Sequence, residues 1–182
     1  MRRKWTIREL AALHASRQAP EQLPDTVLWL HDIRSLHNVG SVFRTADGFG
    51  IRRIFLSGYT PTPPRPEIHK TALGADKSVP WTYFPNAQAA MSALREEGRI
   101  LLAIEQTTDA EPLHAITLDP DSRLCVVFGN EVTGLDDEVL AAADRVVEIP
   151  QFGKKHSLNV SVAAGIVCFG LFSVMESQPH RP

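Results

Sequence analysis

The stretch Leu124-Cys125-Val126-Val127-Phe128 decides the fold class, because it is short, wholly apolar and followed directly by glycine. A run of this length is typical of a strand, and one without polar alternation fits a strand that is buried on both faces. Similar runs occur at 27–30, 53–56, 81–84, 100–104 and 146–149. Helix-like stretches separate them, near 39–49, 67–74, 87–97, 136–143 and 157–175. This alternation predicts an α/β fold, a mostly parallel sheet with helices on both faces.

The chain of 182 residues has the length of one compact domain. We expect a short basic helical extension over 1–24, a main domain over 25–177 and a tail over 178–182. A composition with 43% apolar and 22% charged residues excludes a disordered or disulfide-stapled chain. The net charge of -2 provides no overall attraction to nucleic acid, so any RNA must bind a local basic patch. Cys125 and Cys168 lie in apolar runs and the N-terminus lacks a secretory signal, which together indicate a cytoplasmic protein.

The segment from Ser157 to Met175 contains no charged residue and is long enough to be a transmembrane candidate. Polar and glycine residues interrupt it, however, and no second such segment is present to pack against it in a bilayer. A helix that is apolar all round is also typical of a helix covered by a sheet on one side and a second subunit on the other. We therefore favour a buried helix in a homodimer over a membrane anchor.

The segment from Asn38 to Gly50 fits a helix with two different faces. One face is apolar and is expected to pack on the sheet, and it consists of Val39, Val42, Phe43 and Ala46. On the other face, small residues leave room for a ligand beside Arg44, whose guanidinium can bind phosphate. These small residues are Gly40, Ser41 and Gly48. Asn38 is expected to cap the helix, and an exposed Arg44 that pairs with Asp47 is the simpler alternative.

The segment 129–134, Gly-Asn-Glu-Val-Thr-Gly, follows the strand quoted above. Its two glycines permit a close approach between the backbone and a ligand. Glu131 can accept hydrogen bonds from that ligand or fix a neighbouring side chain. A glycine-punctuated turn without a function fits the same pattern.

A third segment begins at Ile149 and passes through a polar loop into the last apolar helix. Ser157 fits an N-cap, which leaves Asn159 as a polar residue in an apolar helix, where it needs a partner. A small basic patch precedes this helix and consists of Lys154, Lys155 and His156. The simpler interpretation of the patch is a solvated loop.

Together the three segments resemble the SpoU/TrmH-type branch of the SPOUT RNA methyltransferases. The strings that carry the resemblance are N-x-G-S-x-x-R-T-A-D at 38–47, F-G-N-E-x-x-G-L at 128–135 and I-P-x-x-G-x-x-x-S-L-N-V-S-V-A-A at 149–164. The stretch His-Lys-Thr-Ala-Leu-Gly-Ala at 69–75 is also similar to the family. The resemblance covers residues from about 25 to 175, nearly the whole expected main domain.

The resemblance implies S-adenosylmethionine as methyl donor, a ribose 2′-hydroxyl of tRNA or rRNA as acceptor, a homodimer and a C-terminal trefoil knot. It also implies that Arg44 is the catalytic arginine and that Asn38 is its positioning partner. The residues that would complete the active site are Glu131, Ser157 and Asn159. Those that would hold the cofactor are Gly129, Ile149, Gln151 and Leu158.

Methyl transfer to a weakly acidic hydroxyl requires alignment and stabilisation of the oxygen as it gains negative charge. Arg44 can stabilise that charge, but its guanidinium stays protonated, which leaves an RNA phosphate or a water to take the proton. No metal is needed, and the histidines lack the spacing of zinc ligands. The basic residues expected to contact RNA are Arg2, Arg3, Lys4, Arg8, Arg65, Lys70, Lys154 and Lys155. The alternative function is a catalytically inactive module of the same fold that binds the cofactor or RNA.

Overall fold

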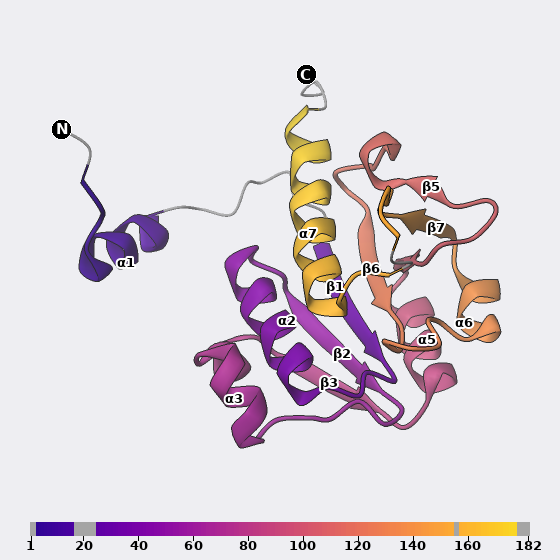
Figure 1. Cartoon of the computed structure of the whole chain (residues 1–182), viewed down its shortest axis with the longest axis horizontal. Coiled ribbons are helices and arrows are strands. Elements are labelled where there is room, and N and C mark those ends of the chain that lie inside the picture. The colour runs from indigo at the N-terminus through magenta and orange to yellow at the C-terminus, as the bar shows by residue number, and fades with distance from the viewer. Residues whose placement is uncertain (1–2, 17–24, 155–156, 178–182) are drawn as a thin grey trace.

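The structure is a computed structural model that describes residues 3–16, 25–154 and 157–177. Its centre is a seven-stranded, all-parallel sheet with the strand order β3-β2-β1-β6-β4-β7-β5. Figure 1 shows the sheet with helices packed around it. The strands are β1 (Asp25–His31), β2 (Arg53–Ser57), β3 (Trp81–Phe84), β4 (Ile100–Ile104), β5 (Glu111–Pro112), β6 (Arg123–Phe128) and β7 (Arg145–Glu148). The predicted α/β class and all six predicted strands are confirmed.

The sequence did not reveal β5, which pairs Glu111 with Val147 and Pro112 with Glu148. This strand has only two residues and no apolar run, so hydrophobic patterning gives no signal for it. Its place at the edge of the sheet explains how a proline is tolerated there, because an edge strand needs ladder hydrogen bonds on one side only.

Helices lie between the strands in the order that the patterning predicted. They are α1 (Ile7–Ser16), α2 (Leu36–Gly48), α3 (Pro66–Ala72), α4 (Ala75–Ser78), α5 (Ala87–Glu96), the 3-10 helix η1 (Leu113–Ala115), α6 (Asp137–Ala142) and α7 (Val160–Ser177). Asn86 caps α5, since its side chain accepts a hydrogen bond from Ala89 N at 2.9 Å. Asp136 holds the N-cap position of α6, but its side chain makes no capping hydrogen bond.

Two other helix starts differ from the prediction. Ser35, not Asn38, caps α2, and its hydroxyl accepts from Asn38 N at 3.3 Å. The helix therefore begins earlier than expected, and the Asn38 side chain is released for other contacts. Helix α7 begins at Val160, so Ser157 lies outside the helix and is not its N-cap. The first helical hydrogen bond runs from Ala163 N to the Asn159 carbonyl.

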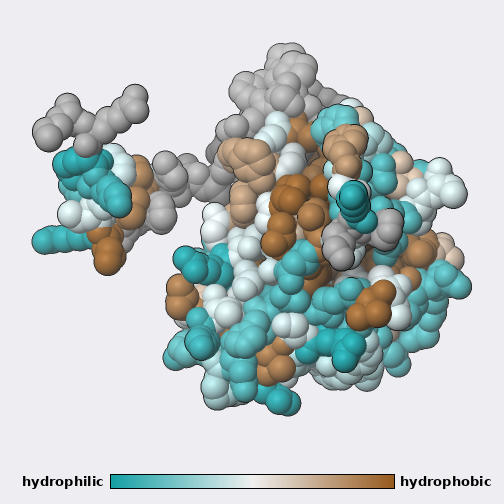
Figure 2. Space-filling model, in the orientation of Figure 1, coloured by the Kyte–Doolittle hydropathy of each residue, from teal (hydrophilic) through white to brown (hydrophobic). Residues whose placement is uncertain are grey.

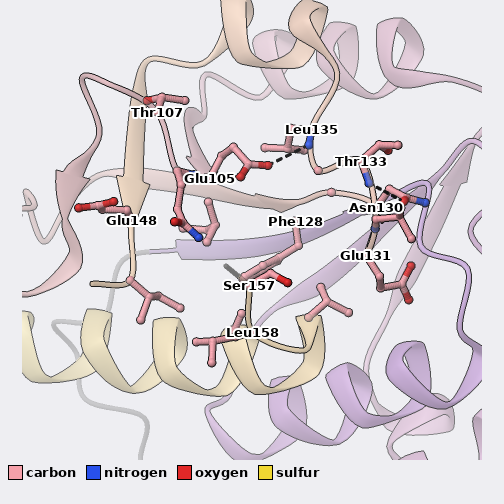
Figure 3. A pocket seen from close by; sticks show the side chains of 18 of the residues that line it. Glu105, Thr107, Phe128, Asn130, Glu131, Thr133, Leu135, Glu148, Ser157 and Leu158 are labelled. Carbon is pink, nitrogen blue, oxygen red and sulfur yellow. Dashed lines mark hydrogen bonds between the residues drawn. The ribbon is translucent and has the colours of Figure 1, made fainter. Parts of the chain in front are cut away.

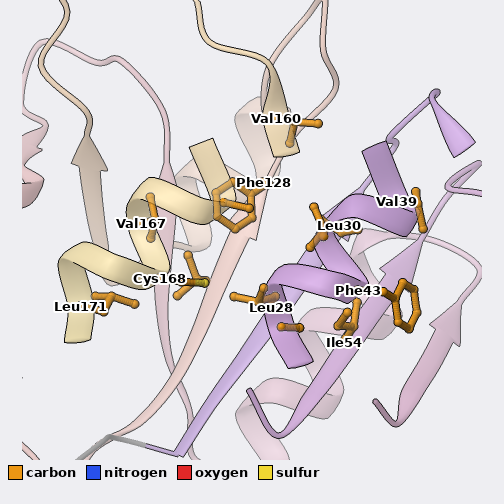
Figure 4. Close-up of a cluster of buried hydrophobic side chains, with 14 of the residues drawn as sticks. Leu28, Leu30, Val39, Phe43, Ile54, Phe128, Val160, Val167, Cys168 and Leu171 are labelled. Atoms are coloured by element: carbon orange, nitrogen blue, oxygen red, sulfur yellow. The ribbon is translucent and has the colours of Figure 1, made fainter. Parts of the chain in front are cut away.

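Alternate strand residues serve two separate cores, one on each face of the sheet. Leu28, Leu30 and Phe128 point to the face that α2 and α7 cover, as Figure 4 shows. Val27 and Trp29 point to the opposite face, which the α5 and α6 side chains cover. Side chains on both faces are almost fully buried, which explains why the strands have no polar alternation.

Helix α7 is apolar around most of its circumference but is covered on only one side. Val167 is fully buried against the sheet, whereas Val162, Ile166 and Phe169 are 50%, 38% and 60% exposed. In Figure 2 apolar side chains gather over this helix. Within the described part of the chain, none of the helices is both long and apolar enough to traverse a bilayer.

Candidate active site

A cavity of about 470 Å³ opens at the carboxyl edge of the sheet, in the size range of small-molecule sites. The loops that follow β4, β6 and β7 form its walls, and the start of α7 closes one side (Figure 3). Parallel sheets bind ligands at this edge because the loops after neighbouring strands converge there. The loops after Ile104, Phe128 and Ile149 are thus in its wall.

The loop 129–135 makes a tight turn whose glycines are needed for close packing. Gly134 has a φ of +73°, and a Cβ atom there would collide with the Glu105 carboxylate. A Cβ at Gly129 would in turn meet the backbone of Gly134. The turn is closed by Asn130, whose backbone exchanges two 3.0 Å hydrogen bonds with Gly134. These glycines therefore serve the turn itself as well as the ligand approach that the sequence suggested.

Glu131 links this loop to the segment after β1. Its two carboxylate oxygens accept hydrogen bonds from Arg34 N at 2.9 Å, Ser35 N at 3.1 Å and Asn38 Nδ2 at 2.9 Å. Burial alone raises the pKa of Glu131, but these donors lower it more, so its pKa lies below the ordinary value. Glu131 is therefore an ionised carboxylate at neutral pH.

Asn38 extends the connection to the third segment. Its Oδ1 accepts a hydrogen bond from Asn159 Nδ2 at 3.1 Å, while its Nδ2 donates to Glu131. Asn159 Oδ1 accepts from Ser161 N at 2.9 Å at the start of α7. The partner that Asn159 needed is thus Asn38, 121 residues earlier. Asn38 contacts Glu131 and Asn159, not Arg44.

The four residues expected to hold the cofactor all line the cavity, as do two of the expected active-site residues. The first group is Gly129, Ile149, Gln151 and Leu158, and the second is Glu131 and Ser157. Leu158 and Ser157 contribute the wall near α7, opposite Glu105 in Figure 3. The structure therefore brings the second and third segments together around one space.

Arg44 lies elsewhere, on the exposed face of α2. It lines a separate hollow of about 610 Å³ together with Lys70, Thr71 and Leu73. None of the described residues forms a hydrogen bond or ion pair with its guanidinium. The alternative pairing with Asp47 is wrong, because Asp47 accepts a hydrogen bond from Ser78 Oγ at 2.9 Å instead. Arg44 therefore presents a positive charge that is available to a ligand.

Gly40 corrects one detail of the predicted helix. The residue is buried, and a Cβ atom there would collide with Thr71 Oγ1 and with the Ile68 carbonyl oxygen. Its missing side chain makes room for α3, which packs on α2, and not for a ligand. Helix periodicity placed the residue on the ligand face beside Arg44 but could not show that α3 would approach it.

The basic residues expected to bind RNA are spread over several elements. Lys4, Arg8, Arg65 and Lys154 are exposed, whereas Arg2 and Lys155 fall outside the described residues. Arg3 is not an available cation, because its guanidinium donates two hydrogen bonds to Glu9 at 2.7 and 2.9 Å. This pairing, with further hydrogen bonds from Thr6, holds the pKa of Glu9 at about 2.

Sequence reasoning missed two residues of the cavity wall. Asn130 is almost buried and donates from Nδ2 to the Asp32 carbonyl at 2.8 Å, which fixes the loop against the end of β1. Glu105 accepts from Leu135 N at 3.1 Å and from Gln106 N at 2.9 Å. A charged residue directly after an apolar strand was the available signal for Glu105.

A histidine between two carboxylates was also missed. His31 is buried, and its Nε2 lies 3.1 Å from Asp136 Oδ2 and 3.6 Å from Asp32 Oδ2. Its Nδ1 lies 2.7 Å from Ser57 Oγ. The three side chains come from the end of β1 and the start of α6, so spacing in the sequence could not bring them together. The expected lack of a metal requirement stays a prediction.

The fold and the cavity define a class, an α/β protein that binds an organic cofactor beyond the carboxyl ends of parallel strands. Within that class the chain belongs to the SpoU rRNA Methylase family, whose profile matches residues 25–169. The family resemblance of the three segments is thereby confirmed.

Curated relatives of this chain are named as guanosine 2'-O-methyltransferases of tRNA or rRNA. A tRNA (guanosine(18)-2'-O)-methyltransferase of Thermus thermophilus is 32% identical over 146 residues, which are 80% of this chain and 73% of that protein. The 23S rRNA (guanosine-2'-O-)-methyltransferase RlmB of Neisseria meningitidis is 31% identical over 144 residues, which are 79% of this chain and 56% of that protein.

Solved structures share the fold. An AdoMet-bound rRNA methyltransferase from Sinorhizobium meliloti superposes with a TM-score of 0.77 at 27% identity. The match covers 84% of this chain and 57% of that one. This chain therefore spans little more than half the length of that protein and of the Neisseria relative.

Proposed function

We propose that this protein transfers a methyl group from S-adenosylmethionine to a ribose 2′-hydroxyl of tRNA or rRNA. The observation that carries the proposal is the hydrogen-bonded link Glu131–Asn38–Asn159. It joins one polar residue from each of the three family segments, of which Glu131 lines the cavity, and a turn without function does not require such a link. The proposal also draws on the family membership and on the named activities of the relatives.

The cavity fits the cofactor in size and in chemistry. Its apolar side chains, among them Leu158, Ile149 and Leu135, suit an adenosine and a methionine chain. All charged side chains among its described lining residues are acidic, which suits a cation. Gly129, Ile149, Gln151 and Leu158 would hold the cofactor, which when bound supplies an electrophilic methyl group on a positively charged sulfur.

Arg44 stabilises negative charge on the acceptor oxygen or clamps the neighbouring phosphate. Its guanidinium is exposed and carries no counter-charge among the described side chains, so an RNA phosphate or oxyanion can take that place. The guanidinium does not act as the base, because it stays protonated. The Asn38, Glu131 and Asn159 side chains hold α2 and α7 in the register that the site needs.

The relatives named above act on guanosines, so a guanosine ribose is the acceptor to examine first. Purified protein is incubated with S-adenosylmethionine that carries an isotope label in its methyl group, together with unmodified tRNA or 23S rRNA transcripts. Nuclease digestion and mass spectrometry then identify 2′-O-methylnucleosides. Labelled 2′-O-methylguanosine supports the proposal. Cofactor binding without transfer to either RNA supports the alternative of an inactive module.

The exposed apolar face of α7 supports a homodimer. Val162, Ile166 and Phe169 form an exposed apolar stripe on one face of the helix, a surface that a second copy of the chain can cover. A Phe169→Glu variant is expected to be monomeric in light scattering, whereas wild-type protein is dimeric. Ile7→Glu, which alters an exposed apolar residue of α1, serves as the control and should stay dimeric. A monomeric wild-type protein at micromolar concentration would contradict the proposal.

A cytoplasmic location and a C-terminal trefoil knot complete the proposal. The two buried free cysteines, Cys125 and Cys168, support a reducing compartment. Family membership supports the knot.

A further inference from the structure

The charges around the cofactor cavity have one sign. Glu105, Glu131 and Glu148 line it, and no lysine, arginine or histidine occurs among its described lining residues. No ion pair joins any of the three carboxylates to a described cation. A small, partly enclosed space lined by three carboxylates that pair with none of the described cations has a negative potential from these residues.

The hydrogen bonds of these carboxylates hold their positions without neutralising them. Glu131 and Glu105 accept only from uncharged N–H donors, three for Glu131 and two for Glu105. Glu148 is half-buried and makes no hydrogen bond to another described side chain. An N–H dipole stabilises an anion where it lies, but the full negative charge still acts on a ligand nearby.

Glu105 is the carboxylate best suited to act on the ligand. Glu131 is committed to the loop after β1, whereas Glu105 stands on the cavity wall opposite Leu158 (Figure 3). Its position is fixed on two sides, by Leu135 N and by the close approach of Gly134. An anion held by these contacts discriminates between ligands by charge, because moving away from a ligand would break the contacts.

The reaction changes the charge of the bound molecule by one unit. The ribose oxygen forms a bond to the methyl carbon and loses its proton to an RNA phosphate or a water, while the carbon–sulfur bond breaks and its electron pair stays on sulfur. The sulfonium thereby becomes a neutral thioether. The donor therefore has one positive charge more than the demethylated product, although the two have nearly the same shape.

We propose that Glu105 makes the cavity prefer the cationic methyl donor to its neutral product, with a smaller contribution from Glu148. The charge difference promotes exchange of spent product for fresh donor at a site where shape alone cannot distinguish them. This inference rests on S-adenosylmethionine as the cofactor.

Calorimetric titration of the whole protein with S-adenosylmethionine and with S-adenosylhomocysteine tests the proposal. Glu105→Gln preserves the size of the side chain and an acceptor for Leu135 N but removes the charge. We expect it to weaken donor binding about fivefold to tenfold and product binding less than twofold. Glu96→Gln, an equal charge change at an exposed position of α5, should alter neither affinity.

The affinity ratio separates an electrostatic role from a structural one. A loop loosened by Glu105→Gln would weaken both ligands equally, and an unchanged or equally lowered pair of affinities overturns the proposal. If this variant does not fold, Glu148→Gln carries the same test with an expected shift of about twofold to threefold in the ratio. Wild-type protein that binds neither ligand would instead refute the proposed function.

Discussion

The two ends of the parallel sheet use acidic residues in opposite ways. At the amino end, Arg99 is almost buried and donates to Glu97 at 2.6 Å and to Asp25 at 3.2 Å. At the carboxyl end, Glu131 and Glu105 accept only from N–H groups. The first arrangement cancels charge and ties strand starts together, whereas the second fixes a carboxylate and keeps its charge available to a ligand.

The pKa values at the two ends reflect these arrangements. Burial raises the pKa of Asp25 and Glu97, but the neighbouring guanidinium groups lower it more. For Glu131 the lowering comes from amide donors and not from a cation. A low carboxylate pKa therefore accompanies either a neutralised network or an anion without a cationic partner, and the identity of the donors distinguishes the two.

The largest expected effect comes from disrupting the ion pairs of Arg99 at the amino end of the sheet. Arg99→Met leaves Asp25 and Glu97 without their buried partner and should lower the free energy of unfolding by about 3–5 kcal/mol in urea denaturation. Arg52→Met removes an exposed guanidinium that also pairs with Asp25, at 3.0 Å, and should cost less than about 1 kcal/mol. Similar losses of unfolding free energy in the two variants would mean that the buried ion pairs of Arg99 stabilise the fold no more than the exposed pair of Arg52.

The next effect concerns chemistry on the carboxyl side of the sheet. Arg44→Ala should lower the methyl-transfer rate by about 10²–10³-fold, because it removes a donor to the developing oxyanion. Its affinity for S-adenosylmethionine and its thermal unfolding should stay close to wild type, since Arg44 lies in a separate hollow. Arg95→Ala, which removes an arginine at an exposed position of α5, is the control and should leave the methyl-transfer rate unchanged. An equal loss of cofactor affinity would contradict the assignment of Arg44 to the acceptor.

A smaller effect depends on pH. Glu131→Gln weakens the hydrogen bonds that the Glu131 carboxylate accepts from Arg34 N, Ser35 N and Asn38 Nδ2. It should lower the free energy of unfolding at pH 7 by about 1–2 kcal/mol. Because the folded pKa of Glu131 is lowered, its stabilisation is complete above the unfolded pKa of about 4.3 and is lost as pH falls through the folded value. The two unfolding curves should therefore converge on acidification. A difference that is constant with pH would show that charge plays no part.

The smallest effect on the sheet and its site is expected from the segment before β1. Deletion of residues 1–8 should leave cofactor affinity intact and weaken binding of every RNA alike. It should flatten the salt dependence by about three units of slope, because Arg3 is already neutralised by Glu9 and only Arg2, Lys4 and Arg8 remain. Filter binding across a salt series measures this, with Arg3→Ala as a variant of nearly unchanged slope. Identical slopes for the truncated and full-length proteins would leave the segment without a role in RNA capture.

The elements of the fold could be predicted because burial imposes a local pattern. Apolar runs such as 124–128 gave all six longer strands, and the apolar face of α2 was placed correctly at Val39, Val42, Phe43 and Ala46. Where a local signal was weak or shared, prediction failed. Both Ser35 and Asn38 suit an N-cap, and only the packed helix shows that Ser35 takes that role.

Short, contiguous patterns in the sequence are sufficient to predict the strand and helix order and to identify the three family segments. Which of their residues meet is evident only in the folded chain. Asn38 joins Glu131 and Asn159 across 93 and 121 residues, and the missing side chain of Gly40 makes room for α3. Glu105 faces the cavity without an ion pair to any described cation. The physical reason is that hydrogen bonds, steric contacts and electric fields act over a few ångströms in space, whatever the separation along the chain.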